Sequence, residues 1–197
     1  MNISNVTRVV MIGLLGLLVA GCATGYHEVV IPHGEWSGHG TCLLKQWPGE
    51  NNDPPELFLF QSYETSLTIQ PAPEEGAIRL EVLTLRGEMP PLDGDRTHLV
   101  VDLTECDRAA DDTAATYQVT NFGISMEDKP LDHHSDPKEP VSASCQVLDG
   151  ELILRINYME GFVDIFRFHG DRLYKDGSFF PEDGQGLVHW SEVLKRQ

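Results

Sequence analysis

From Trp36 onward, apolar and polar residues alternate with a period of two, and this alternation constrains the fold more than any other feature of the chain. Successive side chains of a β-strand point to opposite faces, so the pattern predicts strands with one buried and one wet face. Along 151–159, for example, Leu152, Leu154 and Ile156 share one face. No segment after Trp36 keeps helical spacing over three turns. The sequence therefore predicts an all-β domain.

Turn residues divide this pattern into candidate strands that are short and closely spaced. The strongest turn signal is Asp149-Gly150, a pair favoured in type I′ turns, which predicts a hairpin between its flanking strands. The candidate strands are 35–45, 57–70, 77–87, 97–105, 115–124, 142–148, 151–159, 162–169, a short 172–175, and 187–195. We expect an antiparallel meander that closes into a small β-barrel or barrel-like sandwich of about eight to ten strands.

Within 77–87 the alternation changes parity. Leu80 and Val82 occupy alternate positions, but Leu83 and Leu85 then take the other parity. An extra residue in a strand produces such a change, so the sequence predicts a β-bulge near Val82 and Leu83.

The first candidate strand opens with Gly34-Glu35-Trp36, which resembles the G-x-W opening of lipocalins and related calycin barrels, including the avidin-like ones. In that superfamily the tryptophan closes one end of the barrel and is covered by an arginine or lysine from the end of the last strand. The resemblance assigns this covering role to Lys195 or Arg196. It implies a small calycin-like barrel.

If Trp36 points inward, then Gly38, Gly40 and Cys42 share its face. Two inward glycines leave space, and a barrel of about eight strands has an interior just wide enough for side chains or one small ligand. Trp36, Gly38, Gly40, Cys42 and Arg196 are therefore candidate residues for lining a ligand cavity or closing the barrel. Glycines in strands also mark bulges or close backbone approach, which is the plainer interpretation.

The segment 1–22 resembles the signal peptide and lipobox of bacterial lipoproteins. Arg8 gives a positive start, Val9 to Ala20 form an apolar run, and Val19-Ala20-Gly21-Cys22 places a cysteine after two small residues. The run is too short to span a bilayer, which takes about 20 apolar residues. In this family the cysteine carries a diacylglyceryl group, cleavage follows the preceding glycine, and the new amine is often acylated by a fatty acid such as palmitate. The resemblance implies that Cys22 is the lipidated first residue.

The expected organisation is a removed signal peptide over 1–21, the lipidated cysteine and a short tether over 22–33, and a single β domain over 34–197. Ala23 follows the cysteine, whereas an aspartate there usually signals inner-membrane retention in Gram-negative relatives. The resemblance thus favours the outer membrane of a bacterial cell envelope.

The charge of the chain excludes some partners. Lys and Arg number 14 against 31 Asp and Glu, and removal of Arg8 with the signal peptide leaves 13 basic residues and a net charge of −18. Nucleic acids and anionic head groups are bound through excess Lys and Arg, so neither is expected as a partner. The expected membrane contact is the covalent lipid alone.

Three cysteines remain besides Cys22, namely Cys42, Cys106 and Cys145. An oxidising compartment permits one disulfide and leaves one thiol. All three pairings are open; we favour Cys106–Cys145, with Cys42 as a small buried residue.

Metal and catalytic motifs are not evident. Asp132, His133, His134 and Asp136 lie together within 127–140, but they lack the spacing of a metal site and are expected in a solvated surface segment. No G-x-S-x-G, H-E-x-x-H or G-x-x-x-x-G-K-[ST] pattern occurs. We expect neither a metal nor a cofactor, and an enzyme is the less favoured interpretation.

The sequence thus predicts a membrane-anchored envelope lipoprotein with a non-enzymatic barrel that binds a small apolar ligand. The alternative is an interaction or structural module, with a filled barrel and no ligand site, that presents a segment such as 127–140 to another envelope protein.

Overall fold

The computed structural model describes residues 25–46, 56–85, 96–126, 132–133, 142–159, 161–180 and 186–197. These residues form strands and turns, and no helix is found among them. In these ranges no helical segment has the length and apolarity that a bilayer crossing requires. The strands are β1 (Gly34–Gln46), β2 (Glu56–Pro71), β3 (Ala77–Leu85), β4 (Arg96–Arg108), β5 (Ala114–Met126), β6 (Asp132–His133), β7 (Ser142–Leu148), β8 (Glu151–Met159), β9 (Phe162–His169), β10 (Arg172–Phe179) and β11 (Gly186–Arg196).

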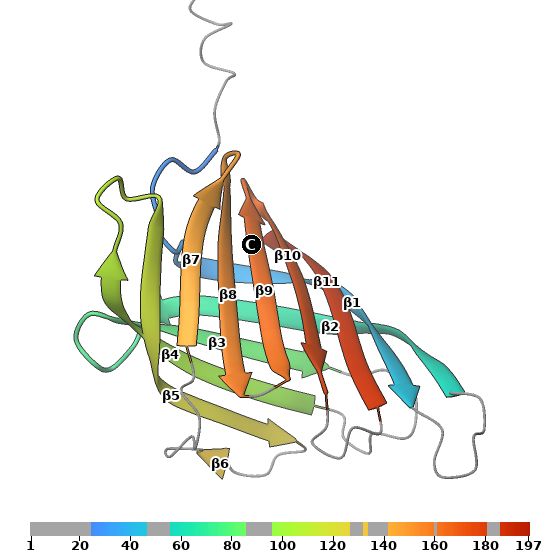
Figure 1. Ribbon diagram of the computed structural model, residues 1–197. Coiled ribbons are helices and arrows are strands. Elements are labelled where there is room, and N and C mark those ends of the chain that lie inside the picture. The colour runs from blue at the N-terminus through green and yellow to red at the C-terminus, as the bar shows by residue number, and fades with distance from the viewer. Residues whose placement is uncertain are drawn as a thin grey trace, which may run out of the picture.

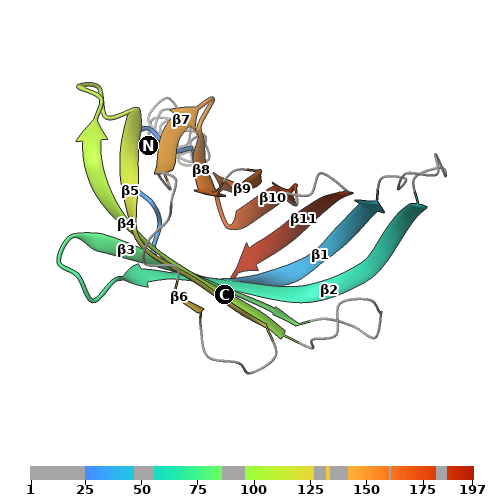
Figure 2. The ribbon, with the colours of Figure 1, turned by 60° about the horizontal axis from the view of Figure 1, so that its bottom comes forward.

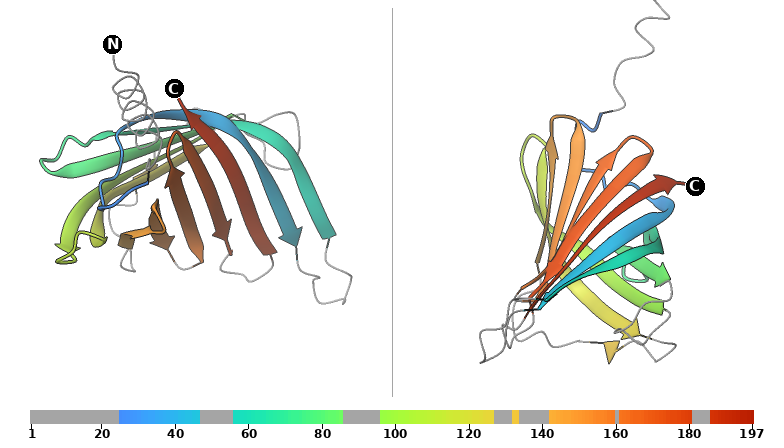
Figure 3. Two further views of the ribbon diagram at one scale, coloured as in Figure 1. Left: turned by 90° about the horizontal axis from the view of Figure 1, so that it is seen from above. Right: turned by 90° about the vertical axis from the view of Figure 1, so that its right-hand side faces the viewer.

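Ten of these strands close into an antiparallel β-barrel. The sheet order is β4-β3-β2-β1-β11-β10-β9-β8-β7-β5, and pairing of β4 with β5 completes the ring. The short β6 pairs with β5 outside this ring. In Figure 1, β1 to β4 cross behind the upright β8 to β11, and the views of Figure 2 and Figure 3 show the strongly twisted wall. The predicted all-β meander that closes into a barrel is confirmed.

Most strand positions agree with the alternation pattern. The observed β7, β8 and β9 have the predicted bounds, and Asp149 and Gly150 have φ angles of 51° and 80°, as a type I′ turn requires. The strand predicted to be short, 172–175, is wrong in length, because β10 runs from Arg172 to Phe179.

The predicted bulge in β3 is also wrong. Pairing of β3 with β2 and with β4 continues without a register shift through Val82 and Leu83. The parity change has another cause: Leu80 and Val82 point into the core, whereas Leu83 and Leu85 are more exposed and line a groove on the outer face. Register shifts occur elsewhere, for example between Gly40 and Cys42 in the pairing of β1 with β2.

The barrel has two distinct ends, which we name after a residue at each. The Trp36 end contains the start of β1, the end of β11 and the turns that join β7 to β8 and β9 to β10. The Phe162 end contains the end of β10 and the starts of β9 and β11. The end of β1 also lies there, where Gln46 pairs with Gly186.

Residues 25–33, which the sequence places in the tether, pack against the barrel. Val29 is fully buried and Ile31 is 4% exposed, and both belong to the hydrophobic core. The Tyr26 amide donates to the Gly150 carbonyl (2.9 Å), and the Val29 amide donates to the Asp112 carbonyl (2.8 Å). This segment therefore covers part of the Trp36 end.

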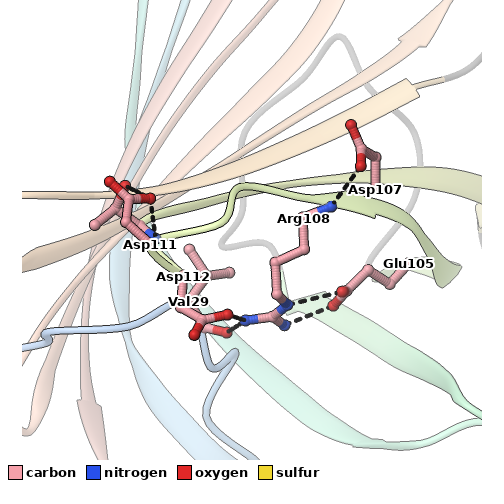
Figure 4. A network of polar contacts seen from close by, with 7 residues as sticks. Val29, Glu105, Asp107, Arg108, Asp111 and Asp112 are labelled. Carbon is pink, nitrogen blue, oxygen red and sulfur yellow. Dashed lines mark hydrogen bonds and ion pairs between the residues drawn. The ribbon is translucent and has the colours of Figure 1, made fainter.

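Arg108 fixes the same segment from the side of β4. Its guanidinium donates to the Val29 carbonyl (3.0 Å) and forms two hydrogen bonds to the Glu105 carboxylate, of 2.8 and 2.6 Å. A longer ion pair joins it to Asp112 (3.6 Å). Figure 4 shows the guanidinium between Val29 and Glu105.

Candidate functional site

Inward side chains of β9, β10 and β11 form four cross-strand rows along the barrel axis. Antiparallel register places residues from the three strands side by side in each row. From the Trp36 end to the Phe162 end the rows are Phe168–Leu173–Leu194, Phe166–Lys175–Glu192, Asp164–Gly177–Trp190 and Phe162–Phe179–Val188. Charged residues thus occupy the two middle rows, between an apolar row and a mainly aromatic one.

These charged side chains are almost completely buried. Asp164, Lys175 and Glu192 are 1%, 6% and 2% exposed. The Lys175 ammonium lies 3.0 Å from Glu192 Oε1 and 3.8 Å from Asp164 Oδ2. Glu192 also accepts hydrogen bonds from the Tyr63 hydroxyl (2.9 Å) and the Thr65 hydroxyl (3.3 Å), both on β2.

Asp164 has its own neutral donors. The Tyr158 hydroxyl donates to Asp164 Oδ2 (3.0 Å), and the indole N–H of Trp190 donates to Asp164 Oδ1 (2.8 Å). Both carboxylates are thus hydrogen-bonded, as buried charges must be. We call this set the charged network; its members are Tyr63, Thr65, Tyr158, Asp164, Lys175, Trp190 and Glu192.

Burial shifts the pKa values in the charged network. It raises the pKa of Asp164, and the negative charge of Glu192 acts in the same direction, although Lys175 opposes it. Burial alone lowers the pKa of Lys175, but the two carboxylates outweigh it and raise the pKa above its ordinary value. Lys175 therefore stays an ammonium. Burial also raises the pKa of Tyr63 and Tyr158, so both remain hydroxyl donors.

The predicted cavity residues Gly38 and Gly40 do not leave empty space in the structure. A Cβ atom on Gly40 would lie 2.5 Å from the Tyr63 ring and 2.7 Å from the Glu192 side chain, so these groups fill its place. A Cβ atom on Gly38 would overlap the backbone of Val193 on β11. Gly38 therefore permits close approach of two strands, and Gly40 makes room for the charged network.

Gly177 on β10 has the same role opposite Asp164. A Cβ atom there would overlap the Asp164 carboxylate and the Trp190 ring. Cys42, the next inward residue after Gly40, is half-buried and pairs in register with Trp190. The inner wall beside the charged network is therefore built of small residues.

An aromatic cluster adjoins the charged network toward the Phe162 end. The Phe162 ring centroid lies 4.5 Å from that of Tyr158, and 5.7 Å from those of Phe179 and Trp190. Phe122 stacks on Tyr158 at 5.1 Å. Phe162, Phe179 and Trp190 are half-buried, whereas Tyr158 is 1% exposed. The cluster separates the charged network from the Phe162 end.

The opposite end is closed by Trp36, which is 2% exposed. Trp36 pairs in register with Arg196, whose guanidinium lies 5.4 Å from the indole ring centroid. Arg196 also donates to the His33 carbonyl (2.6 Å). Lys195, the other candidate cover, is exposed and lies near Asp171 (3.8 Å).

The predicted Cys106–Cys145 disulfide is not formed in the structure. Cys106 is exposed, whereas Cys145 is 1% exposed and belongs to the hydrophobic core. Burial raises the pKa of the Cys145 thiol to about 12. The pairing stays a prediction that alkylation of the native protein can test: maleimide labelling of Cys106 alone would contradict it.

The candidate metal residues fall mainly outside the described ranges. Asp132 and His133 form β6, while 127–131 and 134–141 are not described. Within the described ranges, no group of three or more His, Cys, Asp or Glu side chains is placed to hold a metal ion. Cys22 also lies outside them.

A groove of about 760 Å³ lies on the outer face of the barrel. Leu85 and Val193, which line it, are 36% and 52% exposed. Its rim carries Glu64, Arg172 and Lys195. The groove thus combines an exposed apolar strip with charges of both signs.

Comparison with known proteins does not identify a relative. No protein-family model matches the chain, and neither a curated protein nor a solved structure matches it.

Proposed function

We propose that the protein is a lipid-anchored protein of the bacterial envelope whose barrel binds a small molecule against the aromatic cluster. One observation carries the ligand-binding part of this proposal. Three charged side chains are buried inside the barrel, directly beneath aromatic rings that are half-buried toward the Phe162 end.

Stability alone is a poor reason to keep such a network. Replacement of a buried ion pair by apolar residues is often neutral or stabilising, by about 1–4 kcal/mol, because desolvation opposes the Coulomb attraction. Ligand sites, in contrast, combine apolar and aromatic walls with a few fixed polar groups. The charged network and the aromatic cluster together have this composition.

The aromatic cluster supplies the contact area for an apolar ligand body. Phe162 and Phe179 come from neighbouring strands, and Trp190 comes from the next strand, so a ligand there would contact three elements at once. Aromatic side chains bury about 150–250 Å² each, which makes them effective binding surfaces. This extends the sequence-based proposal of a small apolar ligand.

The lipobox supports the anchor, and the packing of the following residues supports an orientation. Gly25 lies beside Gly150 at the Trp36 end, where a Cβ atom on Gly25 would be 3.2 Å from the Gly150 Cα. Cys22 lies three positions before Gly25, so the Cα atom of the lipidated residue would lie within about 11 Å of that of Gly25. The Trp36 end would then face the membrane and the Phe162 end would face away.

Native mass spectrometry of the protein purified from its host tests the ligand. We expect a retained small molecule that is lost in Trp190→Ala. Tyr174→Ala, on the outer face of β10, is the matched control and should retain the molecule. Absence of any bound mass in the unaltered protein, under conditions that keep it folded, would contradict the proposal.

Substitution of Cys22 tests the anchor separately. Cys22→Ser should abolish incorporation of labelled fatty acid, because the cysteine carries the diacylglyceryl group. The protein should then leave the membrane fraction, because stable anchoring takes two or more acyl chains. Unchanged labelling of this variant would refute the lipobox assignment.

The outer groove favours a second candidate function, that of an interaction module for another envelope protein. Its exposed Leu85 and Val193 have the composition of a small contact surface. Val193→Asp would leave the barrel folded but reduce crosslinking to a partner in cells. Unaltered crosslinking would remove this candidate.

A further inference from the structure

The charged network contains more negative than positive charge. Asp164 and Glu192 contribute two carboxylates, and Lys175 is the only cation among the hydrogen bonds and ion pairs described for them. The hydroxyl and indole donors satisfy the carboxylate oxygens but do not neutralise them. With both carboxylates ionised, the network carries a net charge of −1 in a setting of low dielectric constant, where such a charge is strongly felt.

The aromatic cluster covers this charge on the side of the Phe162 end. The Trp190 indole donates its N–H to Asp164, so a negative charge lies at the edge of the ring. This polarises the indole and makes its faces more negative. The faces of Trp, Tyr and Phe rings attract cations that approach within about 6 Å of the centroid.

Lys175 shows that the Trp190 ring already lies beside an ammonium group. Its Nζ lies 5.9 Å from the ring centroids of both Phe166 and Trp190. Phe162 meets Trp190 at an interplanar angle of 81°, and Phe179 meets Phe162 at 66°. Phe162 thus contacts both neighbouring rings edge to face, so the three rings present differently oriented faces.

We infer that the ligand of the barrel is a small organic cation, an amine or quaternary ammonium compound, whose charge rests against Trp190, Phe162 and Phe179 above the Asp164 carboxylate. This inference rests on the proposed function, since it names the chemical class of the ligand at the same site. The net charge of the mature chain acts in the same direction, because it attracts cations and repels anions.

Proton binding competes with the cation. Burial and the charge of Glu192 raise the pKa of Asp164, and protonation of this carboxyl removes the excess negative charge. Besides Glu192, the groups of the network that face Asp164 are Lys175, Tyr63 and Tyr158, and these three keep their protons at neutral pH. Affinity for the cation therefore falls as the pH is lowered through the pKa of Asp164.

Isosteric probes that differ only in charge test the inference. Calorimetric titration of the lipidated protein in nanodiscs compares choline with 3,3-dimethylbutan-1-ol, and butylammonium with butan-1-ol and butanoate. We expect each ammonium probe to bind at least about tenfold more tightly than its neutral counterpart, and butanoate to bind most weakly. Lowering the pH should reduce the preference for the ammonium probes.

Two variants test whether Asp164 causes the preference for ammonium probes over neutral ones. Asp164→Asn keeps the size of the side chain, removes its charge and leaves one of its two acceptor oxygens, and should bring ammonium and neutral probes to within about threefold of each other. Asp176→Asn is the control, because Asp176 lies on the outer face of β10 and pairs with Arg167 (2.8 Å); it should keep the full preference. If Asp164→Asn does not fold, Trp190→Phe removes the polarising N–H and should reduce the preference instead.

The outcomes separate this inference from the function on which it rests. Equal binding of choline and 3,3-dimethylbutan-1-ol, or tighter binding of butanoate, would overturn the cationic ligand and leave a barrel that binds neutral or anionic molecules. Failure of all probes to bind folded protein, together with no retained ligand in native mass spectrometry, would overturn both.

Discussion

Lys175 is the residue on which the charged network depends most. It lies between two buried carboxylates, 3.0 Å from Glu192 and 3.8 Å from Asp164. We expect Lys175→Met to destabilise the protein by about 3–5 kcal/mol, because both carboxylates then lack their cation. Denaturant unfolding measures this change. Lys195→Met, an exposed lysine on β11, should leave the stability unchanged.

A compensated variant distinguishes charge from packing. Lys175→Met combined with Asp164→Asn and Glu192→Gln leaves no unpaired buried charge, so most of the lost stability should return. Equal instability of the single and triple variants would mean that the shape of Lys175, and not its charge, is what the barrel needs.

Asp164 should make stability fall as pH rises. Burial raises its pKa in the folded state above the unfolded value of about 3.9. Its contribution is therefore fully present below about pH 4 and is lost as the pH rises through the folded pKa. Urea unfolding across this range should show a decline that Asp164→Asn removes. A variant that keeps the same decline would show that other groups cause it.

Asp102 should give the opposite pH dependence of the free energy of unfolding in the same experiment. Burial raises its pKa, but hydrogen bonds from Arg79 (2.7 Å) and Asn121 (3.1 Å) outweigh this, and the net pKa is lowered. Its contribution is present above about pH 4 and is lost as the pH falls through the folded pKa. Asp102→Asn should therefore reduce the loss of stability at acidic pH. The decline in stability at higher pH, which Asp164 causes, should remain.

At the scale of the element, β10 shows why an inner wall needs a glycine. A Cβ atom on Gly177 would overlap Asp164 and Trp190, so Gly177→Ala forces both side chains to move. We expect a loss of about 1–3 kcal/mol, the usual effect of overpacking a core. Ser178→Ala, at the next position of the same strand, is the control and should differ little. An unchanged free energy of unfolding in Gly177→Ala would contradict the packing seen here.

The strands themselves were predictable because their alternation and turns are local signals. The Asp149-Gly150 pair, for example, defines the β7–β8 hairpin without reference to the rest of the chain. The end of β10 was missed because Gly177 interrupts the apolar series in the sequence. In the structure this glycine occupies an inward position of the strand. The parity change at Leu83 was misread because an exposed leucine looks like a buried one in sequence.

The charged network was missed for a related reason. Asp164, Lys175 and Glu192 each occupy an inward position between apolar or small residues, which is a readable sign of a buried charge. The sign is weak in any single strand. The charged network is recognised only when the register between β10 and β11 is known, because that register brings Lys175 opposite Glu192.

At the scale of the whole molecule, Trp36 joins the two ends of the chain. Trp36→Ala should cost about 3–5 kcal/mol, because the emptied volume is enclosed by the core. Arg196→Ala should cost about 0.5–1 kcal/mol, as expected for a cation over an indole at an exposed site. It should also shift tryptophan emission to longer wavelength. Equal losses in both variants would contradict the assignment of Trp36 as the main closing residue.

The pairing of β1 with β11 has a consequence for how the protein is made. Trp36 and Arg196 are paired across about 160 residues, so ring closure waits for the last strand. In a chain synthesised from its N-terminus, β11 with Trp190 and Glu192 would be the last of the described strands to be completed. The polypeptide would remain an open, twisted sheet, vulnerable to proteolysis and in need of a holding chaperone, until synthesis of β11 was complete.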